Sequence, residues 1–142
     1  MENLFTPYVA SEIPDAHNVL VLAPHPDDEV FGCGGALALH VMAGTRVHVV
    51  VCTSGDAAGI SAVREAESQD ASRVIGYVEP VFWGMPDRGL RYGEALVQRI
   101  HDALRMLNAS VVYSPSLWEN HPDHRAIAMA SMEAVRRSTH CE

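Results

Sequence analysis

Residues 18–53 read NVLVLAPHPDDEVFGCGGALALHVMAGTRVHVVVCT, and this stretch decides the fold. Its two ends, residues 18–23 and 46–53, are short apolar runs that are typical of buried strands. Between them, apolar side chains recur at helical spacing around Leu37 and Val41, and Gly44 is a helix stop signal. The stretch therefore predicts a strand, a helix and a second strand.

The same alternation continues along the chain. Residues 61–75 place apolar side chains roughly on one helical face, namely Val63, Ala66, Ala71, Val74 and Ile75. Further strands are predicted at residues 81–84 and 110–114, and further helices at 94–108 and from Pro122 onward. Strand–helix alternation with short turns implies a parallel sheet covered by helices on both faces. We therefore predict the α/β class, with three layers and a mainly parallel sheet.

Length and composition indicate one ordinary globular domain. The chain has 142 residues, of which 48% are hydrophobic and 20% are charged, so neither disorder nor a fibrous repeat is expected. The formal net charge of -8 argues against a nucleic-acid partner, because such surfaces need a basic footprint. Four methionines, Met85, Met106, Met129 and Met132, are interpreted as core residues.

The start of the chain and the cysteines indicate the compartment. Residues 1–17 lack the basic start and the apolar run of a secretory signal, and we interpret them as an N-terminal extension of a domain at 18–142. No stretch is long and apolar enough for a transmembrane segment. Three cysteines at unpatterned spacing, Cys33, Cys52 and Cys141, predict reduced thiols. We therefore expect a cytoplasmic protein.

Polar clusters follow each predicted strand, at residues 24–29, 53–56, 85–88 and 119–124. Ligands of open parallel sheets bind beyond the carboxyl ends of the strands, where these clusters lie. The first and the last cluster are the ones that concentrate imidazoles and carboxylates. Together they offer three histidines and three or four carboxylates, enough for a zinc site with two histidines, one carboxylate and an open position for water. The sequence therefore predicts a metal site where the two loops meet.

Two motifs, APHPDDE at residues 23–29 and HPDH at 121–124, resemble those of the LmbE/PIG-L family of zinc-dependent N-deacetylases. Arg64, followed by Glu67, and Asp87 match two further positions of the family pattern. The resemblance covers the chain from about residue 18 and implies a three-layer Rossmann-like sandwich. Relatives run well past the helix of the HPDH motif, so we expect that the chain lacks their C-terminal part.

The resemblance also implies a division of labour in the two motifs. It gives zinc to His25, Asp28 and His124, and it makes Asp27 the general base that faces the activated water. This division is chemically reasonable, because zinc lowers the pKa of water to about 7 and a carboxylate that does not bind the metal can take the proton. We expect one zinc ion per chain, with another divalent metal such as Fe2+ as the alternative.

The remaining implied roles concern the substrate. His121 is implied to stand opposite the base and to stabilise the negative oxygen and the leaving amine. We expect Asp123 to hold the imidazole of His121 in orientation and to favour its protonated form. Arg64 and Asp87 are implied to contact sugar hydroxyls, and Glu119 stands where some relatives have a tyrosine. The implied activity is removal of an N-acetyl or N-acyl group from a GlcNAc-type amino sugar or a related small amide.

Several plainer interpretations stay open. Arg64 can be a surface residue paired with a glutamate of its own helix, Asp87 a simple turn former, and Asp27 with Asp28 a solvated turn. The other histidines are interpreted as structural, namely His40, His48, His101 and His140.

Two alternative functions are weighed. One is a truncated, non-catalytic metal-binding module, against which the intact Asp27 and His121 count. The other is a non-haem iron oxygenase, which the strand–helix alternation disfavours. The expected partner is a small-molecule amino sugar, and a homo-oligomer is left open.

Overall fold

The computed structural model describes residues 12–57 and 59–138. Strands and helices alternate through these residues, in the order β1 (Asn18–Ala23), α1 (Asp28–Met42), β2 (Arg46–Thr53), α2 (Ser61–Ile75), β3 (Val78–Met85), α3 (Glu94–Leu107), β4 (Val111–Tyr113) and α4 (Pro122–Arg137). The predicted alternation is confirmed, and the third strand is longer than expected. The cysteine at 141 and the histidine at 140 lie outside the described residues.

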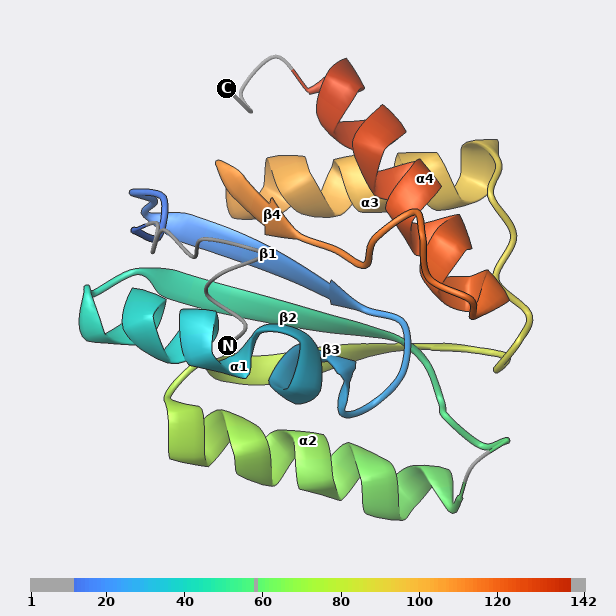
Figure 1. Ribbon diagram of the computed structural model, residues 1–142, viewed down its shortest axis with the longest axis horizontal. Coiled ribbons are helices and arrows are strands. Elements are labelled where there is room, and N and C mark those ends of the chain that lie inside the picture. Colours follow the sequence, from blue (N-terminus) through green and yellow to red (C-terminus); the bar gives the residue numbers. More distant parts are fainter. Residues whose placement is uncertain (1–11, 58, 139–142) are drawn as a thin grey trace, which may run out of the picture.

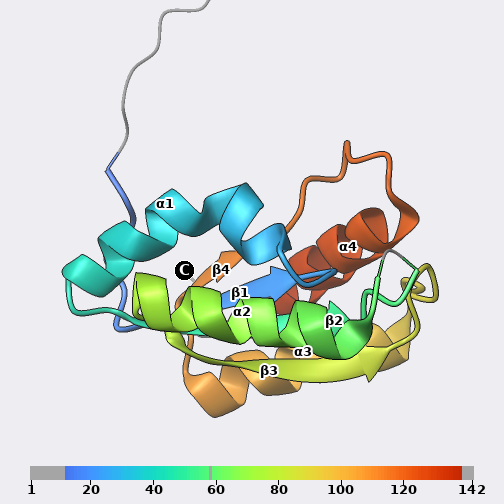
Figure 2. The ribbon, with the colours of Figure 1, turned by 90° about the horizontal axis from the view of Figure 1, so that it is seen from below.

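The four strands form one parallel sheet in the order β3-β2-β1-β4. Val19 of β1 pairs with Val47 of β2 on one side and with Val111 of β4 on the other. Helices α1 and α2 cover one face of the sheet, and α3 and α4 cover the other, as Figures 1 and 2 show. The α/β fold with three layers is therefore confirmed.

Burial on both faces explains the apolar runs of the central strands. In β1, Val19 and Val21 pack with the α1 and α2 side, while Leu20 and Leu22 pack with the α3 and α4 side. All four side chains are at most 2% exposed. Each such side chain stabilises the fold by about 1.5–3 kcal/mol relative to an exposed one. A strand between two helical layers thus needs no polar alternation.

The predicted apolar face of α2 only partly faces the core, where Ile75 packs. Val63 and Val74 are 52% and 86% exposed, whereas Ser68 and Ser72 are 3% and 4% exposed. Ser68 turns inward because its hydroxyl donates a hydrogen bond of 2.7 Å to the buried carboxylate of Glu29. A polar interaction between helices therefore decided the orientation of α2, which apolar periodicity alone did not reveal.

The interpretation of the methionines as core residues was also largely wrong. Met106, Met129 and Met132 are 86%, 43% and 60% exposed, and Met85 alone of the four packs against the core.

In the described part of the chain, no helix is both long enough and apolar enough to cross a membrane.

Candidate active site

The carboxyl ends of β1 and β4 lie side by side because β4 pairs with β1 on the side opposite β2. A reversal of strand order of this kind opens the crevice where ligands bind in open α/β sheets. His25 follows β1 and His124 lies in the first turn of α4. Their Nδ1 and Nε2 atoms are 3.3 Å apart, although the residues are 99 positions apart in the chain. The two loops therefore meet as the sequence predicted.

Three atoms in this crevice form what we call the donor triangle: His25 Nδ1, His124 Nε2 and Asp28 Oδ2. The Asp28 oxygen lies 3.1 Å from each nitrogen, and the nitrogens are 3.3 Å from each other. Nitrogen and oxygen ligands at about 2.0–2.1 Å from a zinc ion, in tetrahedral geometry, lie about 3.3 Å apart. The donor triangle therefore has the size that three ligands of one zinc ion require. A zinc ion held by these three atoms would have room for one further ligand, water or substrate.

The charges around the triangle favour a cation. Burial alone would lower the pKa of His25, but the hydrogen bond and charge of Asp28, together with Asp123 and Asp87, outweigh burial and raise it. Burial alone would raise the pKa of Asp28, but His25 and His124 lower it. The site thus favours positive charge between its carboxylates. A divalent cation meets the same demand with neutral imidazoles and an ionised carboxylate as ligands.

The far side of the His25 ring is supported by carboxylates. Nε2 lies 3.1 Å from Asp123 Oδ2 and 3.1 Å from Asp87 Oδ1. A carboxylate at one ring nitrogen fixes the tautomer and orientation that allow the other nitrogen to bind a metal. His25 therefore has the surroundings of a metal ligand that binds through Nδ1.

Asp123 links this histidine to the loop between β3 and α3. The residue is fully buried, and its carboxylate accepts the N–H groups of Arg88 at 2.7 Å and of Leu90 at 3.1 Å. With His25 as the third partner, little of its acceptor capacity is left for a metal. The carboxylate of Asp123 makes no hydrogen bond to His121, since its partners are His25 and two backbone N–H groups. The expected role of this carboxylate in holding His121 stays a prediction.

Ligand atoms also lie within 4.8 Å of one another in two other groups, namely His25, His121 and His124, which shares both histidines of the triangle, and a group of four, His25, Asp87, His121 and Asp123. The group of four would use the Nε2 side of His25 and the Asp123 carboxylate that two backbone N–H groups already occupy. The donor triangle is therefore the better metal site.

His121 lies beside His25 and caps α4. The two rings are edge to face, with centroids 4.6 Å apart and planes at 83°. His121 Nδ1 accepts the N–H of Asp123 at 3.3 Å, which assigns the ring proton to Nε2. Burial and the nearby imidazoles of His25 and His124 lower the pKa of His121. A neutral ring with an Nε2–H donor is therefore available to a negative oxygen.

Asp27 has an unusual backbone conformation in the turn before α1. Its φ of 103° lies in the left-handed region, which a residue with a side chain adopts at a cost of about 1–2 kcal/mol. Arg64 stabilises this turn, because its Nη2 donates to Asp27 Oδ2 at 3.0 Å and to the carbonyl of Pro26 at 2.6 Å. The partner of Arg64 is therefore the candidate base, and not a glutamate of its own helix.

Arg64 also reaches the loop after β2. Its Nη1 donates to the carbonyl of Gly55 at 2.9 Å, and the side chain is only 16% exposed. Gly55 has a φ of 65°, and a Cβ there would collide with the guanidinium. Contact of Arg64 with a sugar stays a prediction, and the observed bonds give it a clear role in joining two loops.

Asp87 belongs to the same network. Its Oδ1 contacts His25, its Oδ2 accepts the N–H of Ala57 at 3.2 Å, and its side chain is 7% exposed. Asp87 is therefore more than a turn former. The expected contact of Asp87 with sugar hydroxyls stays a prediction.

Sequence reasoning gave no role to Glu29, the last residue of the first motif. Its carboxylate is buried, at 1% exposure, and accepts the hydroxyl of Ser68 at 2.7 Å and the N–H of Asp27 at 3.1 Å. Tyr77 donates a longer bond of 3.4 Å, and burial together with the charge of Glu29 raises the pKa of its hydroxyl. The hydrogen bond that Glu29 accepts from Asp27 thus stabilises the turn before α1. The signal available in the sequence was a third acidic residue in a row, after Asp27 and Asp28, directly before the apolar residues of α1.

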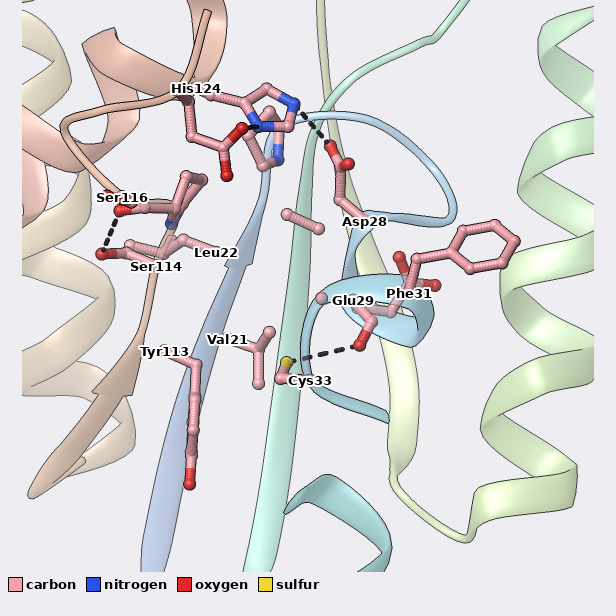
Figure 3. A pocket seen from close by; sticks show the side chains of 15 residues that line it. Val21, Leu22, Asp28, Glu29, Phe31, Cys33, Tyr113, Ser114, Ser116 and His124 are labelled. Atoms are coloured by element: carbon pink, nitrogen blue, oxygen red, sulfur yellow. Dashed lines mark hydrogen bonds and ion pairs between the residues drawn. The ribbon is translucent and has the colours of Figure 1, made fainter. Parts of the chain in front are cut away.

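Two pockets border the donor triangle. The larger, of about 500 Å³, is lined by Asp28, Phe31, Cys33, Tyr113 and His124, among others, and Figure 3 shows Asp28 and His124 pointing toward each other at one end of it. Burial and the charge of Glu29 raise the pKa of Cys33 to about 11, so this thiol is not an ionised metal ligand at neutral pH. The larger pocket is thus a mainly apolar space beside the two ligands.

The smaller pocket, of about 190 Å³, is lined by His25, Asp27, Ala57, Arg64, Asp87, Arg88 and His121. Five of these seven residues had been assigned a role from the sequence, and the exceptions are Ala57 and Arg88. Behind the triangle, His124 Nδ1 is buried without a hydrogen bond and faces Glu119 Oε2 at 3.7 Å. The candidate catalytic and substrate-binding side chains that line the smaller pocket thus lie together, on the other side of the triangle from Glu119.

Comparison with known proteins identifies related structures. The chain is similar to the crystal structure of the conserved protein TT1542 from Thermus thermophilus, with 35% identity and a TM-score of 0.77 over 87% of this chain and 59% of that one. It is also similar to N,N'-diacetylchitobiose deacetylase from Pyrococcus horikoshii, with 30% identity and a TM-score of 0.79 over 86% of this chain and 50% of that one. The chain thus spans about half the length of these two structures.

A third relative has another activity. The 4-oxalmesaconate hydratase of Pseudomonas putida is 26% identical over 84% of this chain and 51% of its own length. Likeness of fold thus leaves the reaction to be argued from the site.

The family model PIG-L, described as GlcNAc-PI de-N-acetylase, matches residues 20–135, which include both histidine motifs and all eight predicted site residues. This match covers most of the chain, and the chain therefore belongs to the PIG-L family.

Proposed function

We propose that this protein is a metal-dependent hydrolase that removes an N-acetyl or N-acyl group from a GlcNAc-type amino sugar or a related small amide. The observation that carries the proposal is the donor triangle, which lies next to a carboxylate outside it, Asp27, and next to an imidazole donor, His121. Deacetylases among the relatives of the chain support the choice of reaction.

His25, Asp28 and His124 would hold the metal ion, with zinc as the expected element and one ion per chain. Bound there, zinc lowers the pKa of water and polarises the acyl oxygen. The same ligand set suits Fe2+. His25 is kept in place by Asp123 and Asp87 on its other nitrogen, so the ligand geometry is prepared in advance.

Asp27 takes the proton of the attacking water and later passes it to the departing amine. Its side chain is 51% exposed, so water reaches it from the smaller pocket. The hydrogen bond from Arg64 fixes the carboxylate, and the left-handed backbone keeps it out of the triangle formed by its neighbour Asp28. A base that is rigid but not a ligand is what this reaction needs.

His121 donates its Nε2–H to the oxygen that becomes negative when water adds to the amide. The hydrogen bond from Asp123 N–H to Nδ1 holds the tautomer that makes this donation available. Arg64 and Asp87 line the same pocket as His121, so we propose that the amino sugar lies there and that its hydroxyls contact these two residues.

The test combines metal analysis with acetate release from methyl N-acetylglucosaminide. We expect the purified chain to carry about one zinc ion and to release acetate, and a chelator to abolish the release. Metal binding without acetate release from any acetylated amino sugar would favour the non-catalytic module. Hydration of an unsaturated acid without amide cleavage would assign the chain to the reaction of its hydratase relative.

A further inference from the structure

Arg88 stands in an unusual backbone conformation at the edge of the smaller pocket. Its φ of 57° lies in the left-handed region, where glycine is unstrained and an arginine costs about 1 kcal/mol or more. The turn is firmly held, because Arg88 N–H donates to the buried Asp123 at 2.7 Å and Gly89 N–H donates to the carbonyl of Pro86 at 3.0 Å. The sequence thus has an arginine at a position where the backbone conformation favours glycine. Outliers of this kind point to a function of the side chain.

The guanidinium of Arg88 has no partner among the residues that the structure describes. Within residues 12–57 and 59–138, no hydrogen bond, ion pair or ring contact engages it, and the residue is exposed. The neighbouring cation of the pocket, Arg64, is bound to Asp27 and to two carbonyls. Arg88 is therefore the cation in this pocket that is available to a ligand.

We propose that Arg88 selects amino-sugar substrates that carry an anionic group, a carboxylate or a phosphate, outside the acylated nitrogen. This inference rests on the proposed function for the position of the sugar. Guanidinium binds both kinds of anion with two parallel hydrogen bonds, which makes arginine more selective than a simple positive charge. Because the protein carries a formal net charge of -8, an anionic substrate would otherwise be repelled.

The local charges agree with this selection. The pocket walls include the carboxylates of Asp27 and Asp87, and Asp27 is already paired with Arg64. A neutral sugar needs no further cation at the rim. An anionic one does, and Arg88 supplies it from a backbone that Asp123 fixes, so binding orders the side chain of Arg88 and not its backbone.

The test uses three probes: methyl N-acetylglucosaminide, N-acetylglucosamine 1-phosphate and carboxymethyl N-acetylglucosaminide. Their dissociation constants from the zinc-loaded chain are measured by calorimetry, and kcat/KM by acetate release. Arg88→Gly removes the side chain and relieves the backbone, so loss of folding is not expected. Arg105→Ala, an exposed arginine in the last turn of α3, is the control for the loss of one positive charge.

We expect the wild-type chain to bind at least one anionic probe more tightly than the neutral one, with an advantage that shrinks as salt is added. Arg88→Gly should weaken binding of the anionic probe about 10–100-fold, and change that of the neutral probe less than about twofold. Arg88→Lys should restore part of the loss, and the Arg105 control should show none. KM should carry the effect, with kcat nearly unchanged.

Equal weakening of all three probes, or no preference for an anion in the wild-type chain, would overturn the inference. Which of the two anionic probes responds tells phosphate from carboxylate. Failure of the proposed function looks different, since selective loss of anion binding in Arg88→Gly without any acetate release would leave the inference standing and remove the deacetylase assignment.

Discussion

Replacing Asp123 by alanine is expected to destabilise the metal-free protein by about 3–5 kcal/mol. Three hydrogen bonds to a buried charge are lost, from Arg88 N–H, Leu90 N–H and His25 Nε2. Hydrogen bonds to a charged group each contribute about 1.5–3 kcal/mol. The three losses are unequal, because the surroundings of the three donors differ.

The Leu90 amide is left without an acceptor in a buried place, since Leu90 is 1% exposed. The Arg88 amide belongs to an exposed residue and can turn to water, and His25 keeps a carboxylate at 3.1 Å in Asp87. The total therefore falls below three full contributions. Asp123→Asn keeps one accepting oxygen and should cost only about 1–2 kcal/mol.

The assay is urea unfolding in the presence of a chelator, so that loss of metal does not add to the result. The matched control is Asp102→Ala, because Asp102 lies on α3 with its side chain 57% exposed, and its loss should change the free energy of unfolding by no more than about 0.5 kcal/mol. A value for Asp123→Ala as small as that of the control would refute the role of this carboxylate in holding the β3–α3 loop.

The other predictions concern catalysis, metal binding and pH. Asp27→Asn should keep the zinc content near one ion per chain and lower kcat about 10²–10⁴-fold, measured by acetate release, and a loss of metal instead would show that Asp27 is a ligand. His124→Ala should abolish zinc binding measured by calorimetry while circular dichroism shows an intact fold, and retained tight binding would count against the donor triangle. His40 is fully buried and burial lowers its pKa, so the unfolded chain binds the extra proton first and the free energy of unfolding should fall as the pH drops below about 6.5. In His40→Gln, whose amide can still bond the Tyr113 hydroxyl, urea unfolding between about pH 7 and pH 5 should show a smaller fall, and an unchanged slope would contradict the assignment.

The proximity of His25 and His124 could be predicted from the sequence, because it depends on two features of the chain only. Each histidine follows a strand that apolar runs mark clearly, and parallel strands bring their carboxyl ends to one edge. The choice of Asp28 as the third ligand was implied by the resemblance to the LmbE/PIG-L family, and the distances within the donor triangle come from the structure. A local pattern and one topological rule were sufficient for the proximity of the two histidines.

The partners of the buried carboxylates could not be predicted in the same way. Glu29 bonds Ser68 of α2, and Asp123 bonds the backbone of a loop more than thirty positions away. These contacts depend on how layers and loops pack, and no periodicity records them. The same cause misplaced the core face of α2, where the inward serine outweighed Val63 and Val74. The domain boundaries and the cytoplasmic location stay predictions.

Anomalous diffraction at the zinc edge, from crystals of the zinc-loaded protein, is the most direct measurement of the central claim. We predict one peak per chain at about 2.0–2.2 Å from His25 Nδ1, His124 Nε2 and an oxygen of Asp28. A peak bound instead through His25 Nε2 with His121 and Asp123, or no peak beside His25 at all, would contradict the account.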